Sequence, residues 1–260
     1  MLSHSRTQKC PFGRRWSALL AGILSALGSV PIFLSSGIFG YDSSSHVAKT
    51  AFLMFSFAQG NFSGWSQFWY SGFQLFYTYS PLTYILAGAF GAPFNSAMLG
   101  MKILIVLSFF LSGFGAFILA RDFGIPENWS MVAALLYSLT SPHILTIFYV
   151  GSMTYALAFA LAPFLFLTFR IALREQTLHS LVYFGIMIGL LIISNETTCY
   201  VLLFPMIMYA LASTPLSRAS GTCLMIAGSS VGFLLSAFWL LPYMNLDLSG
   251  QLDLLRVLKR

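Results

Sequence analysis

Charged residues are scarce in this chain of 260 residues. They occupy 8% of the positions, whereas apolar residues occupy 58%. So little charge cannot cover the surface of a water-soluble domain of this size, which excludes a soluble enzyme or a soluble binding module. The net charge of +6 comes from basic residues that sit at the ends of apolar runs. It therefore indicates membrane topology and gives no reason to expect a nucleic-acid partner.

Cysteine is also sparse. Cys10, Cys199 and Cys223 are scattered and lie mostly in or beside apolar runs. They form neither a disulfide framework nor a metal-binding pattern, so we expect them to be buried as small apolar residues. The sequence also lacks a Gly-rich phosphate loop and a nucleophile elbow, and nothing in it resembles a nucleotide-sugar binding domain.

Long apolar runs are abundant, and many approach the length that crosses a hydrocarbon core of roughly 30 Å. They predict an all-α fold, a polytopic transmembrane helical bundle of about seven spans. Residues 1–16 are expected to be cytoplasmic, residues 17–243 to form the transmembrane domain, and residues 244–260 to begin an outer loop or a tail. The expected spans are residues 17–39, with a kink near Pro31, and residues 98–119, 130–149, 154–173, 178–194, 199–212 and 221–243.

Basic residues set the expected orientation. Arg14 and Arg15 precede the first span, and Arg121, Arg170 and Arg174 lie in short connections that should share its side. Because positive residues favour the cytoplasmic side, we expect a cytoplasmic N-terminus in the plasma (inner) membrane. The apolar segment 81–94 is too short to span comfortably and predicts a juxtamembrane or re-entrant helix. The first outer loop is then residues 40–97, the longest extracytoplasmic segment.

That loop begins with GYDSSSHVAK, residues 40–49. If a helix begins at residues 43–45, Asp42 takes the N-cap position, and His46 and Lys49 fall on nearly one face. One interpretation is that Asp42 caps an interfacial helix whose His46 and Lys49 face lipid headgroups. The other is a catalytic carboxylate held at the membrane surface. The residues alone leave both open.

Aromatic residues follow in the same loop, where residues 60–86 hold two Trp and four Tyr. An aromatic belt at the membrane interface explains them. A sugar or isoprenoid site explains them too, because aromatic planes stack on apolar faces while interleaved polar groups bind hydroxyls.

The order of these features resembles the GT-C superfamily of membrane glycosyltransferases, and within it the branch called 6-pyruvoyl-tetrahydropterin synthase-related membrane proteins. The resemblance rests on the topology and on a few short motifs. These are Asp42 and His46 in GYDSSSHVAK, Trp65, Trp69 and Gly72 in GWSQFWYSG, Tyr79 and Tyr84 in YSPLTY, and Lys102 in MLGMKIL.

The resemblance implies transfer of a sugar from a polyprenyl-phosphate-linked donor, within the lipid bilayer, at the extracytoplasmic face. It makes Asp42 the general base or the ligand of a divalent cation such as Mg²⁺ or Mn²⁺. His46 would hold the donor phosphate or share the proton, and Lys49 and Lys102 would offset the phosphate charge. The aromatic residues Trp65, Trp69, Tyr79 and Tyr84 would contact the substrate.

Two further ionisable residues are candidates for substrate binding. His143 follows Pro142 inside an apolar run, where an ionisable group is a functional candidate. The alternative is a neutral His bonded to a carbonyl that the proline frees. Glu196 lies in a tight outer turn. It is either a solvated turn residue or a second acid that joins Asp42, if the fifth and sixth spans pack near the first loop.

Two alternatives to an enzyme remain. The connection YVGSMTY, residues 149–155, lacks the second acid that many GT-C enzymes carry, and such proteins are typically longer. The chain is then a non-catalytic membrane subunit or a fragment that a C-terminal partner chain completes. A transporter or flippase half is the other alternative, because prolines interrupt several spans, although the halves share no repeat.

Overall fold

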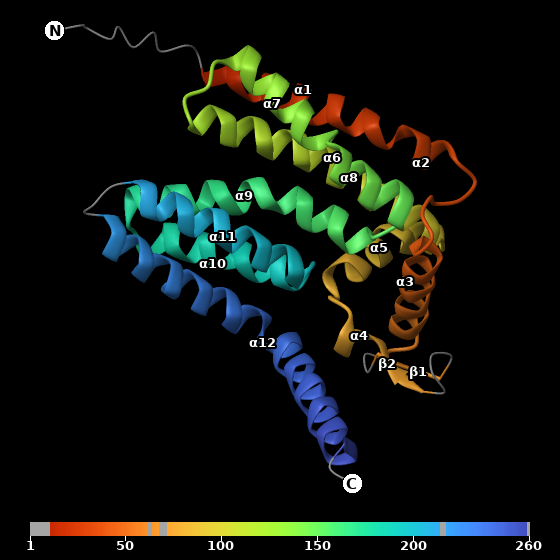
Figure 1. Cartoon of the computed structure of the whole chain (residues 1–260). Helices are drawn as coiled ribbons and strands as arrows, with labels where there is room; N and C mark the ends of the chain where they lie inside the picture. Colours follow the sequence, from red (N-terminus) through yellow and green to blue (C-terminus); the bar gives the residue numbers. More distant parts are fainter. Residues whose placement is uncertain (1–10, 62–63, 68–71, 214–216, 259–260) are drawn as a thin grey trace, which may run out of the picture.

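The computed structural model describes residues 11–258 except 62–63, 68–71 and 214–216. Helices make up nearly all of the described chain, which confirms the predicted all-α fold (Figure 1). A short antiparallel sheet, β1 (Trp65–Ser66) with β2 (Phe73–Gln74), is the exception among the described residues.

Five helical stretches of the described residues are long and apolar enough to cross a membrane. They correspond to five of the seven predicted spans. The other two predicted spans, 178–194 and 199–212, coincide with shorter apolar helices, so the count of seven is not confirmed. The segment 81–94 is also a short apolar helix, as predicted. The five stretches are Trp16–Leu34, Ala97–Asp122, Glu127–Val150, Met153–Glu175 and Ile226–Met244.

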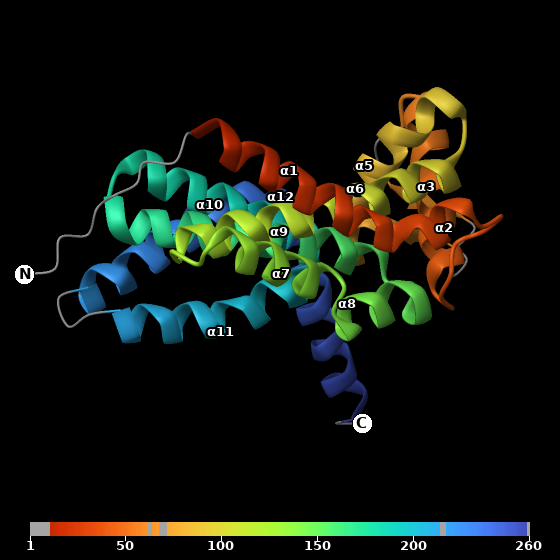
Figure 2. The ribbon, with the colours of Figure 1, turned by 90° about the horizontal axis from the view of Figure 1, so that it is seen from above.

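Two groups of helices lie side by side (Figures 1 and 2). In the first group, α6 (Ala97–Asp122) packs against α1 (Pro11–Ala26) and α7 (Glu127–Ser138). Its other face packs against α9, which opens the second group. The second group consists of α9 (Met153–Glu175), α10 (Leu178–Ile192), α11 (Glu196–Ser213) and α12 (Ser217–Leu258).

The remaining elements gather at one end of the bundle (Figure 1). A 3₁₀ turn, η1, interrupts the first span just before Pro31, where a kink was predicted. The third predicted span is also interrupted, because α7 ends at Ser138 and a new helix begins at Ser141 with Pro142 in its first turn. The elements are η1 (Leu27–Ser29), α2 (Val30–Leu34), α3 (Ser43–Ala58), α4 (Leu75–Thr78), α5 (Leu82–Gly91), η2 (Ala92–Phe94), α8 (Ser141–Leu145) and η3 (Thr146–Val150).

Small residues allow α10 and α12 to approach closely. A Cβ atom added at Gly185 would lie 2.5 Å from Val231, and one added at Gly228 would lie 2.2 Å from the Phe184 ring. Glycines at such positions let transmembrane helix backbones come into contact, which supplies dispersion energy where the hydrophobic effect cannot.

The second group of helices differs from the predictions at its C-terminal end and at one cysteine. Residues 244–258, expected to begin an outer loop or a tail, continue α12 as helix, and its last part leaves the bundle (Figure 1). Cys199 is buried as predicted, but Cys223 is exposed, which corrects that prediction. Cys223 lies on a face of α12 that the described helices do not cover. Cys10 lies outside the described residues.

Candidate functional site

Asp42 immediately precedes α3, so the predicted helix start is confirmed. The carboxylate makes no capping hydrogen bond, although Asp42 holds the N-cap position. Its Oδ2 atom instead lies 3.2 Å from Nε2 of His46, one helical turn ahead. The Asp42 side chain is 45% exposed. The simple capping interpretation is therefore wrong, and the carboxylate lies beside the His46 ring while it remains open to the outside.

His46 connects Asp42 to the interior. Its ring is buried, and Nδ1 lies 2.7 Å from the hydroxyl oxygen of Tyr84 on α5. A carboxylate can only accept hydrogen bonds, so Nε2 must carry the ring proton if it is to bond Asp42. Nδ1 is then the acceptor, and the Tyr84 hydroxyl donates to it. The Nε2 contact is at ion-pair distance but is not aligned as a hydrogen bond.

Burial fixes the protonation states of this group. It lowers the pKa of His46 to about 4, with Lys49 acting in the same direction and Asp42 opposing. Burial also raises the pKa of Tyr84 well above its usual value. At neutral pH the pair is therefore a neutral imidazole and an intact phenol, which is the combination the hydrogen bond requires.

Lys49 lies one turn further along the same face of α3 and is fully buried. Its ammonium donates to the Ser45 hydroxyl and lies 3.9 Å from the centre of the Tyr79 ring, a cation–π contact. Burial lowers the pKa of Lys49, while Asp42 raises it. The expectation that His46 and Lys49 face headgroups is therefore wrong, because α5 covers this face of α3.

The connection YVGSMTY holds Asp42 from the other side. The backbone N–H of Asp42 donates to the Val150 carbonyl over 3.0 Å. Gly40 and Gly151 touch, since a Cβ atom added at Gly40 would lie 2.4 Å from the Cα atom of Gly151. Both have positive φ values, +96° and +82°. This connection lacks an acid, but it positions the backbone of the residue that has one.

Glu196 reaches the same loop from the turn between α10 and α11. The Ser80 hydroxyl donates to Oε2 of Glu196 over 2.7 Å, and the N–H of Leu82 donates to the Ile193 carbonyl over 3.0 Å. Ser80 directly follows Tyr79, which packs on Lys49. The condition set for Glu196 is thus met: its turn packs against the first outer loop, and Glu196 is half-buried there.

Three other predicted residues lie apart from this group. Lys102 is buried and donates to the Ser35 carbonyl, so it ties α6 to the end of the first span. Trp65 lies on β1 and is 51% exposed. His143 is buried between the rings of Phe159 and Phe109, at 4.2 and 4.7 Å between centroids. Trp69 lies outside the described residues.

The expected hydrogen bond from His143 to a backbone carbonyl is absent. Within the described residues neither ring nitrogen of His143 has a hydrogen-bond partner. Aromatic rings, rather than freed carbonyls, surround the imidazole.

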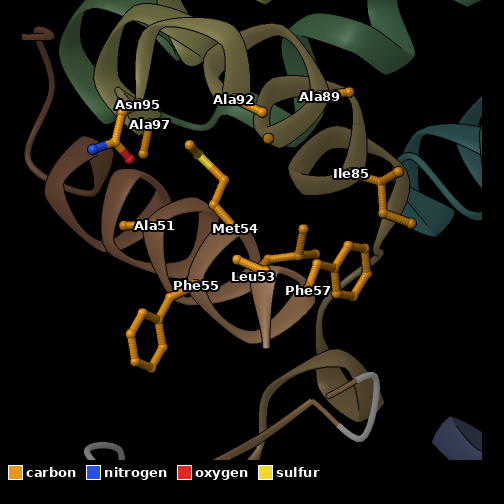
Figure 3. A pocket seen from close by; sticks show the side chains of 12 residues that line it. Ala51, Leu53, Met54, Phe55, Phe57, Ile85, Ala89, Ala92, Asn95 and Ala97 are labelled. Atoms are coloured by element: carbon orange, nitrogen blue, oxygen red, sulfur yellow. The ribbon is translucent and has the colours of Figure 1, made fainter. Parts of the chain in front are cut away.

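An apolar pocket of about 540 Å³ lies between α3, α5 and the start of α6 (Figure 3). On α3 its wall is the stripe beside the one that carries His46 and Lys49. Its size falls within the range of pockets that hold small ligands or parts of larger ones. The lining residues are Ala51, Leu53, Met54, Phe55, Phe57, Ala58, Ile85, Gly88, Ala89, Ala92, Asn95 and Ala97.

The described residues around Asp42 offer few ligands for a divalent cation. Among the described residues there is no group of three or more His, Cys, Asp and Glu side chains that could hold a metal ion. Mg²⁺ and Mn²⁺ prefer several oxygen ligands, whereas Asp42 has one imidazole beside it. The divalent cation implied by the resemblance therefore stays a prediction.

Comparison with known families gives one match. A family model described as "6-pyruvoyl-tetrahydropterin synthase related domain", a membrane protein, matches residues 76–254, more than half of the chain. No curated protein matches the chain. The matched segment includes Tyr79, Tyr84 and Glu196, and it begins after Asp42 and His46.

Proposed function

We propose that this chain, which belongs to the 6-pyruvoyl-tetrahydropterin synthase related domain family of membrane proteins, is a membrane glycosyltransferase. It transfers a sugar from a polyprenyl-phosphate-linked donor to an acceptor hydroxyl at the extracytoplasmic face. The observation that carries the proposal is the half-exposed Asp42 carboxylate, held at 3.2 Å by the neutral, buried His46.

Asp42 is the general base in this proposal. It takes the proton of the acceptor hydroxyl while the hydroxyl oxygen bonds to the anomeric carbon of the sugar. The bond from that carbon to the phosphate oxygen breaks, and the lipid phosphate leaves with the electron pair. One carboxylate oxygen faces His46, which leaves the other for the acceptor.

His46 is a positioning residue, not a phosphate ligand. Its ring is 3% exposed, and its two nitrogens face Asp42 and Tyr84. Tyr84 fixes the tautomer, the tautomer presents Nε2–H to the carboxylate, and the carboxylate keeps one orientation. This is the arrangement by which a buried neighbour orients a general base.

Lys49 supports the leaving group through its charge rather than by contact. Its ammonium is buried between Ser45 and Tyr79, close enough for Asp42 to influence its pKa. A fixed positive charge in a poorly hydrated place stabilises negative charge that develops nearby. Lys102 lies further from this group and is committed to Ser35.

The apolar pocket between α3 and α5 takes the first isoprene units of the donor. Its walls are Ala, Met, Phe, Ile and Leu side chains with few polar groups, and it adjoins the face of α3 that carries the polar residues. A lipid-linked donor needs such a groove beside the reacting carbon, since its chain cannot enter water.

A non-catalytic membrane subunit is the second candidate. It is favoured by the burial of His46, Lys49 and Lys102, all of which have partners within the chain, as structural residues do. In that case the loop is a docking platform, and Asp42 is only a hydrogen-bond acceptor on its surface.

The test is transfer of a radiolabelled sugar from a pool of lipid-linked donors, using membranes that contain the wild-type chain or a variant. Asp42→Asn should reduce transfer by about 10²–10⁴-fold, the usual contribution of a general base. Ser44→Ala is the control, because Ser44 is exposed in the same motif. Equal transfer by wild type and Asp42→Asn, or none by either, supports the subunit instead.

A further inference from the structure

The opposite end of the bundle carries a second polar group, built where α6 and α9 end. Asp122 binds two arginines of α9: Arg170 through Nε at 2.7 Å, and Arg174 through Nη1 at 3.2 Å. Arg170 also lies 3.6 Å from the centre of the Phe123 ring and donates to the Tyr209 hydroxyl. Arg170 therefore joins α9 to the end of α6 and to α11, and it holds this end together.

An apolar groove of about 330 Å³ runs away from this group. Phe123 belongs to both, because one face of its ring contacts Arg170 and its side chain lines the groove. The lining comes from α6, α7, α9 and α11. The lining residues are Ala116, Leu119, Ala120, Phe123, Ile125, Ala133, Tyr137, Ala162, Pro163, Phe166 and Leu202.

Two arginines next to residues of the groove keep donors to spare. Within the described residues, the guanidinium of Arg121 makes one hydrogen bond, from Nη1 to the carbonyl of Ile125, a residue that lines the groove. Its Nε is buried and has no partner there, so the donors that an anion can reach are those of the terminal nitrogens. Among the described residues, Arg174 makes one ion pair, the one to Asp122, and its side chain is 61% exposed. A guanidinium has five N–H donors, so each of these two arginines has donors that can bind an anion.

The groove is shorter than one leaflet of a bilayer is deep. Its α6 wall runs from Phe123 back to Ala116, about 10 Å at 1.5 Å per residue. Half of a hydrocarbon core is about 15 Å deep. A lipid acyl chain that enters the groove at the membrane surface, beside Phe123, therefore leaves the groove inside the same leaflet.

We propose that this groove binds one acyl chain of an anionic phospholipid, whose phosphate is held by Arg121 and Arg174. The charge and the shape select the same ligand: guanidinium groups beside the groove recognise a phosphate, and an apolar groove that stays within one leaflet recognises part of its hydrocarbon tail. The site is separate from the Asp42 group and does not depend on the proposed activity.

The test is native mass spectrometry of the purified full chain, released from micelles that contain equal amounts of phosphatidylglycerol and phosphatidylcholine. The wild type should retain phosphatidylglycerol in preference. Arg121→Gln and Arg174→Gln should each weaken retention about fivefold, and together about 25-fold, because an arginine near a lipid surface contributes on that scale.

A groove variant completes the test. Ala133→Phe fills the channel from α7 and should abolish retention while both arginines remain. Soluble inorganic phosphate, added in excess, should not displace the lipid. Equal retention of the two lipids, unchanged retention in the double arginine variant, or displacement by phosphate would each overturn the proposal. The Tm of each variant in phosphatidylcholine micelles identifies any variant that has merely unfolded.

Discussion

Nδ1 of His46 lies 2.7 Å from the hydroxyl oxygen of Tyr84, and the two rings stack with 5.7 Å between their centroids. The two residues are 38 positions apart and belong to different helices. This contact joins α3 to α5 beside the Asp42 carboxylate. In the proposed function it sets the tautomer of His46, which orients that carboxylate.

Removal of the Tyr84 hydroxyl tests the contact itself. Tyr84→Phe keeps the ring stack but leaves Nδ1 of His46 buried without a partner, which costs about 1–3 kcal/mol. The free energy of unfolding of the purified chain, measured by thermal or denaturant unfolding in micelles, should fall by that amount. Tyr41→Phe is the control, since Tyr41 is 74% exposed and should change nothing. Equal stability of the two variants would contradict the assignment.

The lowered pKa of His46 predicts a pH dependence of stability. The folded value is about 4 and the usual value is 6.5. Between these values the unfolded chain binds a proton that the folded chain does not, so the free energy of unfolding falls as pH decreases from 6.5 to 4 and levels off below that. The loss is of the order of 3 kcal/mol.

Comparison with His46→Gln isolates this contribution from those of other groups. The difference in stability between wild type and variant should shrink from pH 7 to pH 4.5. If the stability difference between wild type and variant stays constant over this range, His46 has the same pKa in the folded and the unfolded chain, which would contradict the prediction.

The contact between Gly40 and Gly151 predicts that a side chain at position 40 is not tolerated. Gly40→Ala places a Cβ atom 2.4 Å from the Cα atom of Gly151, at a φ of +96° that also strains an alanine. Asp42 should lose its backbone bond to Val150, and the loop should become sensitive to protease. Gly60→Ala separates the two effects, because Gly60 has a φ of +70° but nothing within 4 Å. It should cost only about 1 kcal/mol.

The close packing of α10 on α12 predicts that a larger residue at Gly228 lowers the stability of the protein. Gly228→Ala would place its Cβ atom 2.2 Å from the buried Phe184 ring, so the helices must separate. Overpacking of this kind typically costs about 1–3 kcal/mol. Gly37→Ala, at a position with nothing within 4 Å, should leave the Tm unchanged. A Gly228→Ala chain as stable as wild type would show that this helix contact is looser than described.

Much of the fold follows from hydropathy and helix signals. Five predicted spans and the short helix at 81–94 could be found because apolar runs have a length set by the bilayer. The start of α3 could be found because Asp42 precedes an apolar helix pattern. The count of spans was less predictable, since residues 178–194 and 199–212 are as apolar as the others but form shorter helices.

The sequence predicted some of the residues that the structure brings together around Asp42, but it did not predict all of their contacts. Asp42 and His46 lie four positions apart, so their contact follows from helix geometry, and the Lys49–Ser45 bond could have been found by the same spacing. No local signal indicates that Tyr84 donates to His46, because that contact depends on how α5 packs on α3.

Long-range partners were the hardest to predict. Ser80 was missed as the partner of Glu196, and Asp122 was missed as the partner of the arginines of α9. Both pairs join segments that are far apart in sequence. Their proximity follows from the packing of whole helices, which a single sequence does not reveal.

The most direct test of the central claim is a double-mutant cycle on Asp42 and His46, using the initial rate of sugar transfer from saturating lipid-linked donor. If His46 acts only by orienting the carboxylate, His46→Gln should slow wild type about tenfold or more, yet should not slow Asp42→Asn further. The account predicts that the double variant equals Asp42→Asn. A double variant whose rate falls by the product of the two single losses would contradict it. So would an Asp42→Asn variant that transfers sugar as fast as wild type.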